Sequence, residues 1–115
     1  MEIRAKLKGY RMGARKGRAV ADQIRLKSCA EALDILRHSP RGAGRPIEKL
    51  LRSALANAEE QNVRHSAGID LDNLYVKTIV VDEGPRNWRI RPRAQGRAAW
   101  INKATSHVSV VLDER

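Results

Sequence analysis

Phenylalanine is absent from this 115-residue sequence, and aromatic residues make up only 3% of it. A core must therefore be built from leucine, isoleucine, valine and alanine, within the single domain that this length suits. The lone cysteine, Cys29, excludes an internal disulfide, and it is not spaced with the three scattered histidines as a metal site requires. No apolar run is long enough for a transmembrane helix, and residues 1–16 lack the apolar segment of a secretory signal. We therefore expect one domain in a reducing compartment, without a metal, a cofactor or a membrane partner.

Positive charge is what the sequence has in excess. The chain has 23 lysines and arginines against 13 acidic residues, a formal net charge of +10 and a pI near 10.6. The excess lies at the two ends: residues 1–27 hold nine basic and two acidic residues, and residues 84–115 hold seven and two. Residues 28–83 are slightly acidic, with seven basic and nine acidic residues, as expected of a solvated surface. Such an excess attracts polyanions, so nucleic acid is the first partner to consider and an anionic membrane surface the second.

The N-terminal basic residues fall on a predicted strand and a predicted helix. Residues 3–8 alternate between apolar and basic side chains, which predicts a strand with one buried and one basic face. Residues 14–25 predict a helix that buries Val20, Ala21 and Ile24. The candidate RNA-binding residues here are Arg4, Lys6, Lys8, Arg11, Arg15, Lys16, Arg18, Arg25 and Lys27. The alternative is that these side chains only form a solubilising surface.

Two further helices follow. Ser28 and Glu31 have the spacing of a capping box, so we expect a helix from residue 29 to about 38, where Ser39-Pro40 ends it. Pro46 suits the first turn of the next helix. The best helical periodicity in the chain predicts that this helix is the core helix, through Ile47, Leu50, Leu51, Ala54, Leu55 and Ala58. We interpret residues 61–73 as a polar connection.

Residues 74–81 and 105–112 are rich in β-branched side chains and predict two strands. The expected order is therefore strand, three helices, two strands. This order favours an α+β domain of 1–115, with helices packed on a small antiparallel sheet.

The segment between these strands, residues 84–105, has the sequence GPRNWRIRPRAQGRAAWINKAT and contains no acidic residue. Its basic residues are Arg86, Arg89, Arg91, Arg93, Arg97 and Lys103. Strong strands on both sides predict one continuous hairpin that turns near residues 91–96 and protrudes from the sheet, with residues 84–104 as an extended basic arm. Such a ribbon has no core of its own and should become ordered against a partner that neutralises its charge, and arginine suits phosphate and base contacts.

Other interpretations of the arm stay open at this level. One alternative is a flexible basic loop, and Trp88 and Trp100 either stack on bases or fill gaps in packing. A DNA-binding architectural protein with a basic β-ribbon is the main rival to an RNA-binding protein. An enzyme is disfavoured, because the basic regions contain no paired carboxylates and no nucleophile–base motif. Asp82-Glu83 at the base of the arm is interpreted as structural.

Six motifs occur in an order that carries a resemblance. They are RKGRAVADQIR at 15–25, CAEALDIL at 29–36, SALANAEE at 53–60, VDEGP at 81–85, PRAQGRA at 92–98 and TSHVSVV at 105–111. Together they cover nearly the whole chain and resemble the universal family of large-subunit ribosomal proteins numbered twenty-two. The first helix departs from the family pattern: Gly13 weakens its N-cap, and Leu26 stands where a glycine normally ends it.

The resemblance implies a non-enzymatic structural component of the large subunit of a cytoplasmic or organellar ribosome. Its implied partners are the large-subunit rRNA, neighbouring large-subunit proteins and the nascent polypeptide, and it assists subunit assembly. The family's arm runs along the wall of the peptide exit tunnel. The residues implied to line the tunnel here are Trp88, Arg89, Ile90, Arg91, Pro92, Arg93 and Ala94. Trp88 lies in the variable part of the arm, so its role is not inherited.

Overall fold

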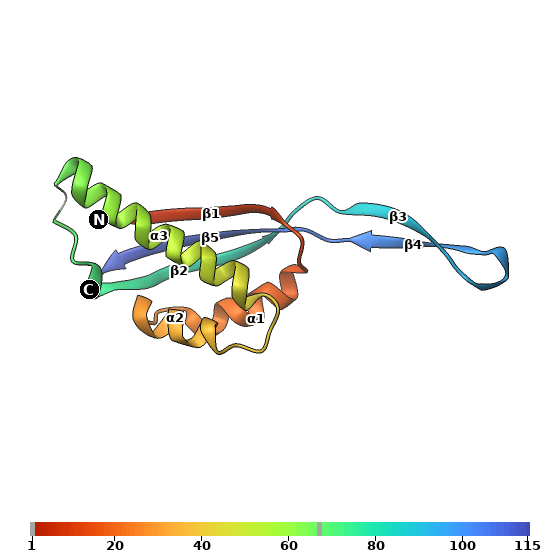
Figure 1. Cartoon of the computed structure of the whole chain (residues 1–115), viewed down its shortest axis with the longest axis horizontal. Coiled ribbons are helices and arrows are strands. Elements are labelled where there is room, and N and C mark those ends of the chain that lie inside the picture. Colours follow the sequence, from red (N-terminus) through yellow and green to blue (C-terminus); the bar gives the residue numbers. More distant parts are fainter. Residues whose placement is uncertain (1, 67) are drawn as a thin grey trace.

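A three-stranded antiparallel sheet carries three helices against one face and a two-stranded arm at one end (Figure 1). The computed structural model describes residues 2–66 and 68–115. The elements are β1 (Ile3–Tyr10), α1 (Ala14–Ile24), α2 (Cys29–Arg37), α3 (Gly44–His65), β2 (Leu74–Glu83), β3 (Asn87–Pro92), β4 (Ala98–Lys103) and β5 (Ser106–Glu114). The longest axis is 65 Å, against 27 and 16 Å for the other two, because the arm continues beyond the sheet. This order and layering confirm the predicted α+β class.

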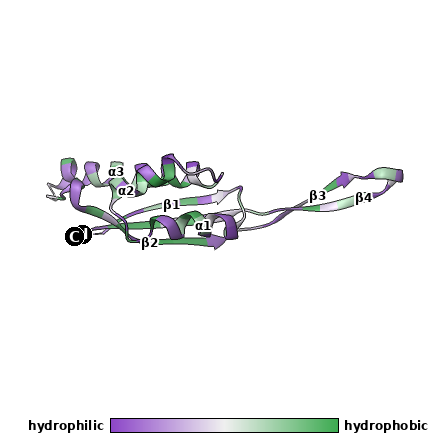
Figure 2. Ribbon diagram, turned by 90° about the horizontal axis from the view of Figure 1, so that it is seen from below, coloured by the Kyte–Doolittle hydropathy of each residue, from purple (hydrophilic) through white to green (hydrophobic). Residues whose placement is uncertain are grey.

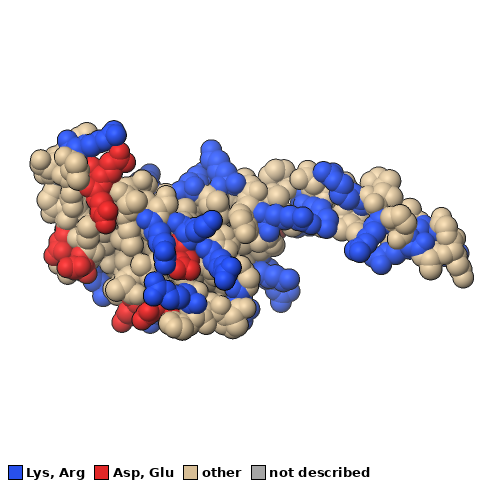
Figure 3. Space-filling view, viewed as in Figure 1, with Lys and Arg blue, Asp and Glu red and all other residues tan. Residues whose placement is uncertain are grey.

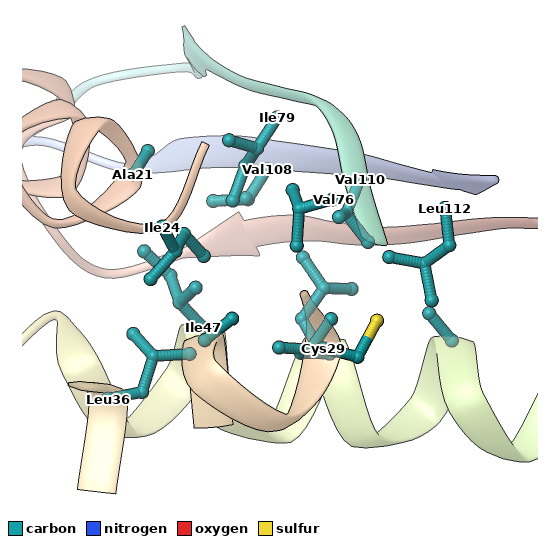
Figure 4. Packing of buried hydrophobic residues seen from close by; sticks show 14 of the residues in the cluster. Ala21, Ile24, Cys29, Leu36, Ile47, Val76, Ile79, Val108, Val110 and Leu112 are labelled. Carbon is teal, nitrogen blue, oxygen red and sulfur yellow. The ribbon is translucent and has the colours of Figure 1, made fainter. Parts of the chain in front are cut away.

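Strand β5 is the centre of the sheet, and it pairs with β1 on one side and with β2 on the other. The register aligns three rows of apolar side chains, which are Ile3–Leu112–Val76, Ala5–Val110–Ile79 and Leu7–Val108–Val81. Figure 4 shows members of these rows, Val76 and Ile79 of β2 and Val108, Val110 and Leu112 of β5, on the side of the sheet that faces Ile24, Cys29 and Ile47. In profile, α2 and α3 form a layer beside the sheet, α1 lies at the level of β2, and the arm extends past them (Figure 2). The core is therefore aliphatic, as the lack of phenylalanine required.

The helices bury most of the residues that their periodicity indicated. Val20, Ala21 and Ile24 of α1 are fully buried. The Ser28 hydroxyl oxygen accepts a hydrogen bond from the Glu31 amide at 3.3 Å, which confirms the cap of α2. On α3, five of the six predicted core residues are buried, and Leu55 is partly buried.

The interpretation of residues 61–73 as a polar connection is wrong for residues 61–65. The third helix continues to His65, because polar side chains on the exposed face of an amphipathic helix do not end it. The side-chain amide of Asn62 then donates to the Ile69 carbonyl and accepts from the Ile69 amide, both at 2.8 Å. This pair holds Ile69 in the core, where it is 5% exposed.

The outer edge of β2 is closed by the segment that follows α1. The Leu26 amide donates to the Val76 carbonyl, and the Val76 amide donates to the Lys27 carbonyl, both at 2.9 Å. Farther along the same edge, Arg25 donates to the Ile79 carbonyl at 3.0 Å and Arg18 donates to the Val81 carbonyl at 3.1 Å. Two guanidinium groups thus pair with backbone groups that an open sheet edge would leave to solvent or to another chain.

Leu26 adopts a left-handed conformation in this connection, with φ of 65°, and its side chain is 58% exposed. A left-handed residue at the end of a helix is usually glycine, because a Cβ atom makes that conformation unfavourable. The absence of a glycine here, noted from the sequence, therefore corresponds to backbone strain at one exposed position.

We expect Leu26→Gly to raise the free energy of unfolding by about 0.5–1 kcal/mol, which is the left-handed penalty less the greater chain entropy of glycine. Urea unfolding followed by circular dichroism measures this change. Leu26→Ala is the matched control, since it removes the exposed side chain and keeps the strain. Equal stabilities of the glycine and alanine variants would contradict the assignment.

The prediction of one continuous hairpin is wrong in one respect. The sheet strands end at Glu83 and begin again at Ser106, and the arm is a separate two-stranded sheet of β3 and β4. Residues 84–86 and 104–105, which we call the neck, interrupt both strands. Proline at position 85 has no amide hydrogen for a strand ladder, which is a local reason for the break.

We call residues 1–83 and 106–115 the head. We expect the head to fold without the arm, because every buried core residue lies outside residues 82–105. Replacing residues 86–104 with Asn-Gly should leave a cooperative thermal transition detectable by circular dichroism. Burial raises the pKa of the Cys29 thiol to about 11, so this cysteine should also stay unreactive to thiol reagents in the native variant. Rapid labelling of Cys29, or loss of the transition, would contradict a self-sufficient head.

Candidate nucleic-acid interface

The neck fixes the arm to the head through close backbone contacts. The Gly84 amide donates to the Thr105 carbonyl at 2.9 Å, and the Thr105 hydroxyl donates to the Pro85 carbonyl at 2.6 Å. A Cβ atom on Gly84 would lie 2.6 Å from Thr105 Oγ1 and 3.2 Å from His107 Nε2, which is closer than side chains normally pack. His107 Nδ1 accepts a hydrogen bond from the Gly9 amide at 2.8 Å. The VDEGP and TSHVSVV motifs therefore meet here, and His107 has a structural role.

The pairing of β3 with β4 divides the arm into two chemically different faces. Trp88 pairs with Asn102 and Ile90 with Trp100, so these four side chains share one face, which we call the aromatic face. On the other face, Arg89 pairs with Ile101, Arg91 with Ala99, and Asn87 with Lys103. We call this the cationic face. Sequence reasoning did not separate the two faces, since the separation depends on the register.

The tip of the arm is a tight turn. Arg97 donates its amide to the Ala94 carbonyl at 3.4 Å, and Arg93 donates its amide to the Arg97 carbonyl at 2.6 Å. Gln95 and Gly96 both have positive φ, of 61° and 69°, as the central residues of a type I′ turn do. The turn places Arg93 and Arg97 opposite each other, beside the end of the hairpin.

Two hollows lined by cations lie where the arm meets the head, and both are lined by Arg11. The larger, of about 520 Å³, is also lined by Lys16 and Arg41. The smaller, of about 260 Å³, is also lined by Arg89 and Lys103 from the cationic face. We call these five side chains the basic band. Arg41 was not among the predicted residues, because its RGAGR loop carries no signal that the fold brings it beside Lys16.

The alternating face of β1 is basic as predicted. Arg4, Lys6 and Lys8 are exposed, while Ile3 is buried. Arg4 forms an ion pair with Glu2 at 3.2 Å. A hydrogen bond from Lys77, with that from Arg4, holds the pKa of Glu2 below its usual value. The positive charge of this strand is therefore least compensated toward Lys8, at the end nearer the arm (Figure 1).

The remaining predicted RNA-binding residues lie at several separate places on the head and neck. Arg18 and Arg25 are engaged at the β2 edge, as described above. Arg86 lies 3.7 Å from Glu83 in an exposed ion pair. Arg15 and Lys27 are exposed on the head, outside the basic band. Figure 3 shows basic side chains along the arm and on the adjoining part of the head, whereas the acidic side chains visible there lie on the head.

Other kinds of site find little support in the described part of the chain. Among residues 2–66 and 68–115, no group of three histidine, cysteine, aspartate or glutamate side chains is placed to hold a metal ion. None of the described helices is long and apolar enough to cross a membrane. Positive charge is the main chemical property of this surface.

Fold and charge define the class: a small, strongly basic α+β protein with a projecting β-hairpin. Comparison with known protein families matches residues 5–113 to the family described as Ribosomal protein L22p/L17e. The chain belongs to this family and is accordingly a non-enzymatic, structural protein of the large ribosomal subunit. Membership implies rRNA and ribosomal proteins as its partners.

We expect Gly84→Ala to lower the free energy of unfolding by about 1–3 kcal/mol, because the new methyl group would overlap Thr105. Thermal and urea unfolding measure the loss. Gly42→Ala is the matched control, since a Cβ atom there has open space. Thr105→Ala should cost less in the Gly84→Ala background than alone, and strictly additive losses would argue against the contact.

Proposed function

We propose that this protein binds large-subunit rRNA through its basic band and the cationic face of its arm, assists subunit assembly, and lines the peptide exit tunnel with the arm. The observation that carries the proposal is the acid-free ribbon projecting from a self-contained head, in a chain of the L22p/L17e family.

The basic band suits a phosphate backbone. Arg11 lines both hollows, so cations from α1, the α2–α3 loop and the arm form one continuous surface where the arm meets the head. Arginine donates to phosphate in a bidentate geometry, and lysine adds a point charge. An RNA strand that follows this band would contact the head and the arm together.

The arm needs a partner to be well ordered. Every residue of β3 is exposed, and a lone two-stranded ribbon is marginally stable in water. Binding to RNA would neutralise the arginines and restrict the ribbon at the same time. Assembly of the subunit and ordering of the arm are then coupled, which is the physical basis of the proposed assembly role.

The shape and charge of the arm support the proposed tunnel-lining role. The two strands lie roughly 5 Å apart, so the ribbon is thin enough to run along a wall without filling a passage. The tip of the ribbon includes Arg91, Pro92, Arg93 and Ala94, which are all exposed and would face a passing nascent polypeptide. A nascent chain would therefore meet positive charge on a short, rigid turn. A cross-linker placed at Ala94 should capture nascent polypeptide in translating ribosomes.

The electrostatic mechanism predicts a steep loss of affinity with salt. Each phosphate contact contributes roughly 0.7–0.9 to the slope of log affinity against log salt. Arg89→Gln and Lys103→Gln should each lower the slope by about that amount for a large-subunit rRNA fragment. Filter binding at several salt concentrations measures it.

Arg64→Gln is the control for that experiment, because Arg64 carries the same charge at the far end of α3, in an ion pair with Glu60 at 3.0 Å. A slope that is flat, or equally reduced in the Arg64 variant, would refute the assigned surface. Equal affinity for duplex DNA of the same length would instead favour the architectural DNA-binding alternative.

A further inference from the structure

The aromatic face of the arm is the feature that phosphate binding does not use. Ile90 lies directly opposite Trp100. Trp88 lies on the same face, two residues closer to the neck. Residues in such diagonal positions of a ribbon are close enough for large side chains to interact. The three side chains therefore form a short apolar row along one side of the hairpin.

This row is open to solvent in the isolated protein. Trp88 is 55% exposed, Ile90 60% and Trp100 67%. Exposed apolar side chains in a row usually mark a contact surface. The face thus has an uncovered apolar area, as expected of a surface that another molecule covers.

The positive charge of the arm indicates which kind of molecule covers the aromatic face. The segment that carries the two tryptophans has six cations and no acidic residue, so a ligand of the ribbon as a whole is a polyanion. The cationic face can follow the phosphates, but it offers no aromatic ring to the bases. Tryptophan presents a large flat surface on which any nucleobase stacks, and RNA-binding proteins select unpaired bases in this way.

We propose that the aromatic face stacks on unpaired nucleobases of the RNA whose phosphates the cationic face binds. The two faces of the hairpin then bind different parts of the RNA. Trp88 and Trp100 contact bases, and Arg89, Arg91 and Lys103 contact the phosphate backbone. This inference rests on the proposed RNA-binding function and adds the kind of RNA that the arm selects, namely single-stranded or looped segments.

The experiment uses the fact that the chain has only two tryptophans, both in the arm. Intrinsic tryptophan fluorescence of the full chain therefore reports on the arm alone. The probes are an oligoadenylate of about 12 nucleotides, within the usual site size for single strands, a fully paired RNA duplex with the same number of phosphates, and an uncharged apolar peptide. Stacking should quench the fluorescence with the oligoadenylate and much less with the duplex.

Matched substitutions separate stacking from apolar packing. Trp88→Tyr and Trp100→Tyr keep an aromatic ring, whereas Trp88→Leu and Trp100→Leu keep only apolar bulk. We expect each leucine variant to lose affinity for oligoadenylate roughly 5- to 100-fold and each tyrosine variant to retain most of it. The leucine variants should keep the wild-type salt slope, because a stacking contact releases no counterions. Arg89→Gln should do the opposite and lower the slope.

The outcomes distinguish this inference from the function on which it rests. If the wild-type protein binds neither RNA probe, RNA binding itself fails. If it binds both but its fluorescence is unchanged, or the leucine variants bind as the wild type does, only the stacking inference fails. A reduced salt slope in the leucine variants would mean that the tryptophans merely shape the ribbon. Quenching by the peptide and not by RNA would assign the face to polypeptide instead.

Discussion

The close contact of Gly84 with Thr105 and His107 is the constraint on which the relation between head and arm depends. It joins the end of β2 to the start of β5, and the hydrogen bond from Gly9 to His107 brings the end of β1 to the same place. All three sheet strands are thus fixed where the arm begins. The hydrogen bonds of Gly84 and Pro85 with Thr105 hold the two strands of the neck together, so the neck sets the direction in which the arm leaves the head.

The head and the arm differ in what stabilises them. The head buries an aliphatic core on β5 and closes its outer strand edge with Arg18 and Arg25, and we therefore expect it to fold without RNA. The arm buries almost nothing and is stable as a ribbon only with a partner. A protein built this way can fold first and order its arm later, which separates the stability of the domain from the affinity of the complex.

The sequence predicted those features that depend on local pattern. Helix periodicity, the Ser28 cap and the β-branched strands sufficed for the fold class, and the six motifs for the family. The length of α3 was missed, because the polar residues near Gln61 that suggest a loop also suit an exposed helix face. The sequence did not indicate that Arg18 and Arg25 also donate hydrogen bonds to the edge of β2, or that Arg41 lines a hollow with Arg11 and Lys16. Contacts between distant segments decide these roles, and no local pattern encodes them.

The two faces of the arm follow from a single further constraint, the turn at Gln95 and Gly96. Once positive φ angles fix that turn, the pairing of every residue back to Asn87 and Lys103 is determined, and a shift of one residue would move each side chain to the opposite face. Such a shift would put Trp88 among the arginines. The type I′ geometry at the tip therefore controls the chemistry of the whole ribbon, just as the neck controls its direction. An arm fixed at both ends in this way can present phosphate-binding and base-stacking surfaces to one RNA without a core of its own.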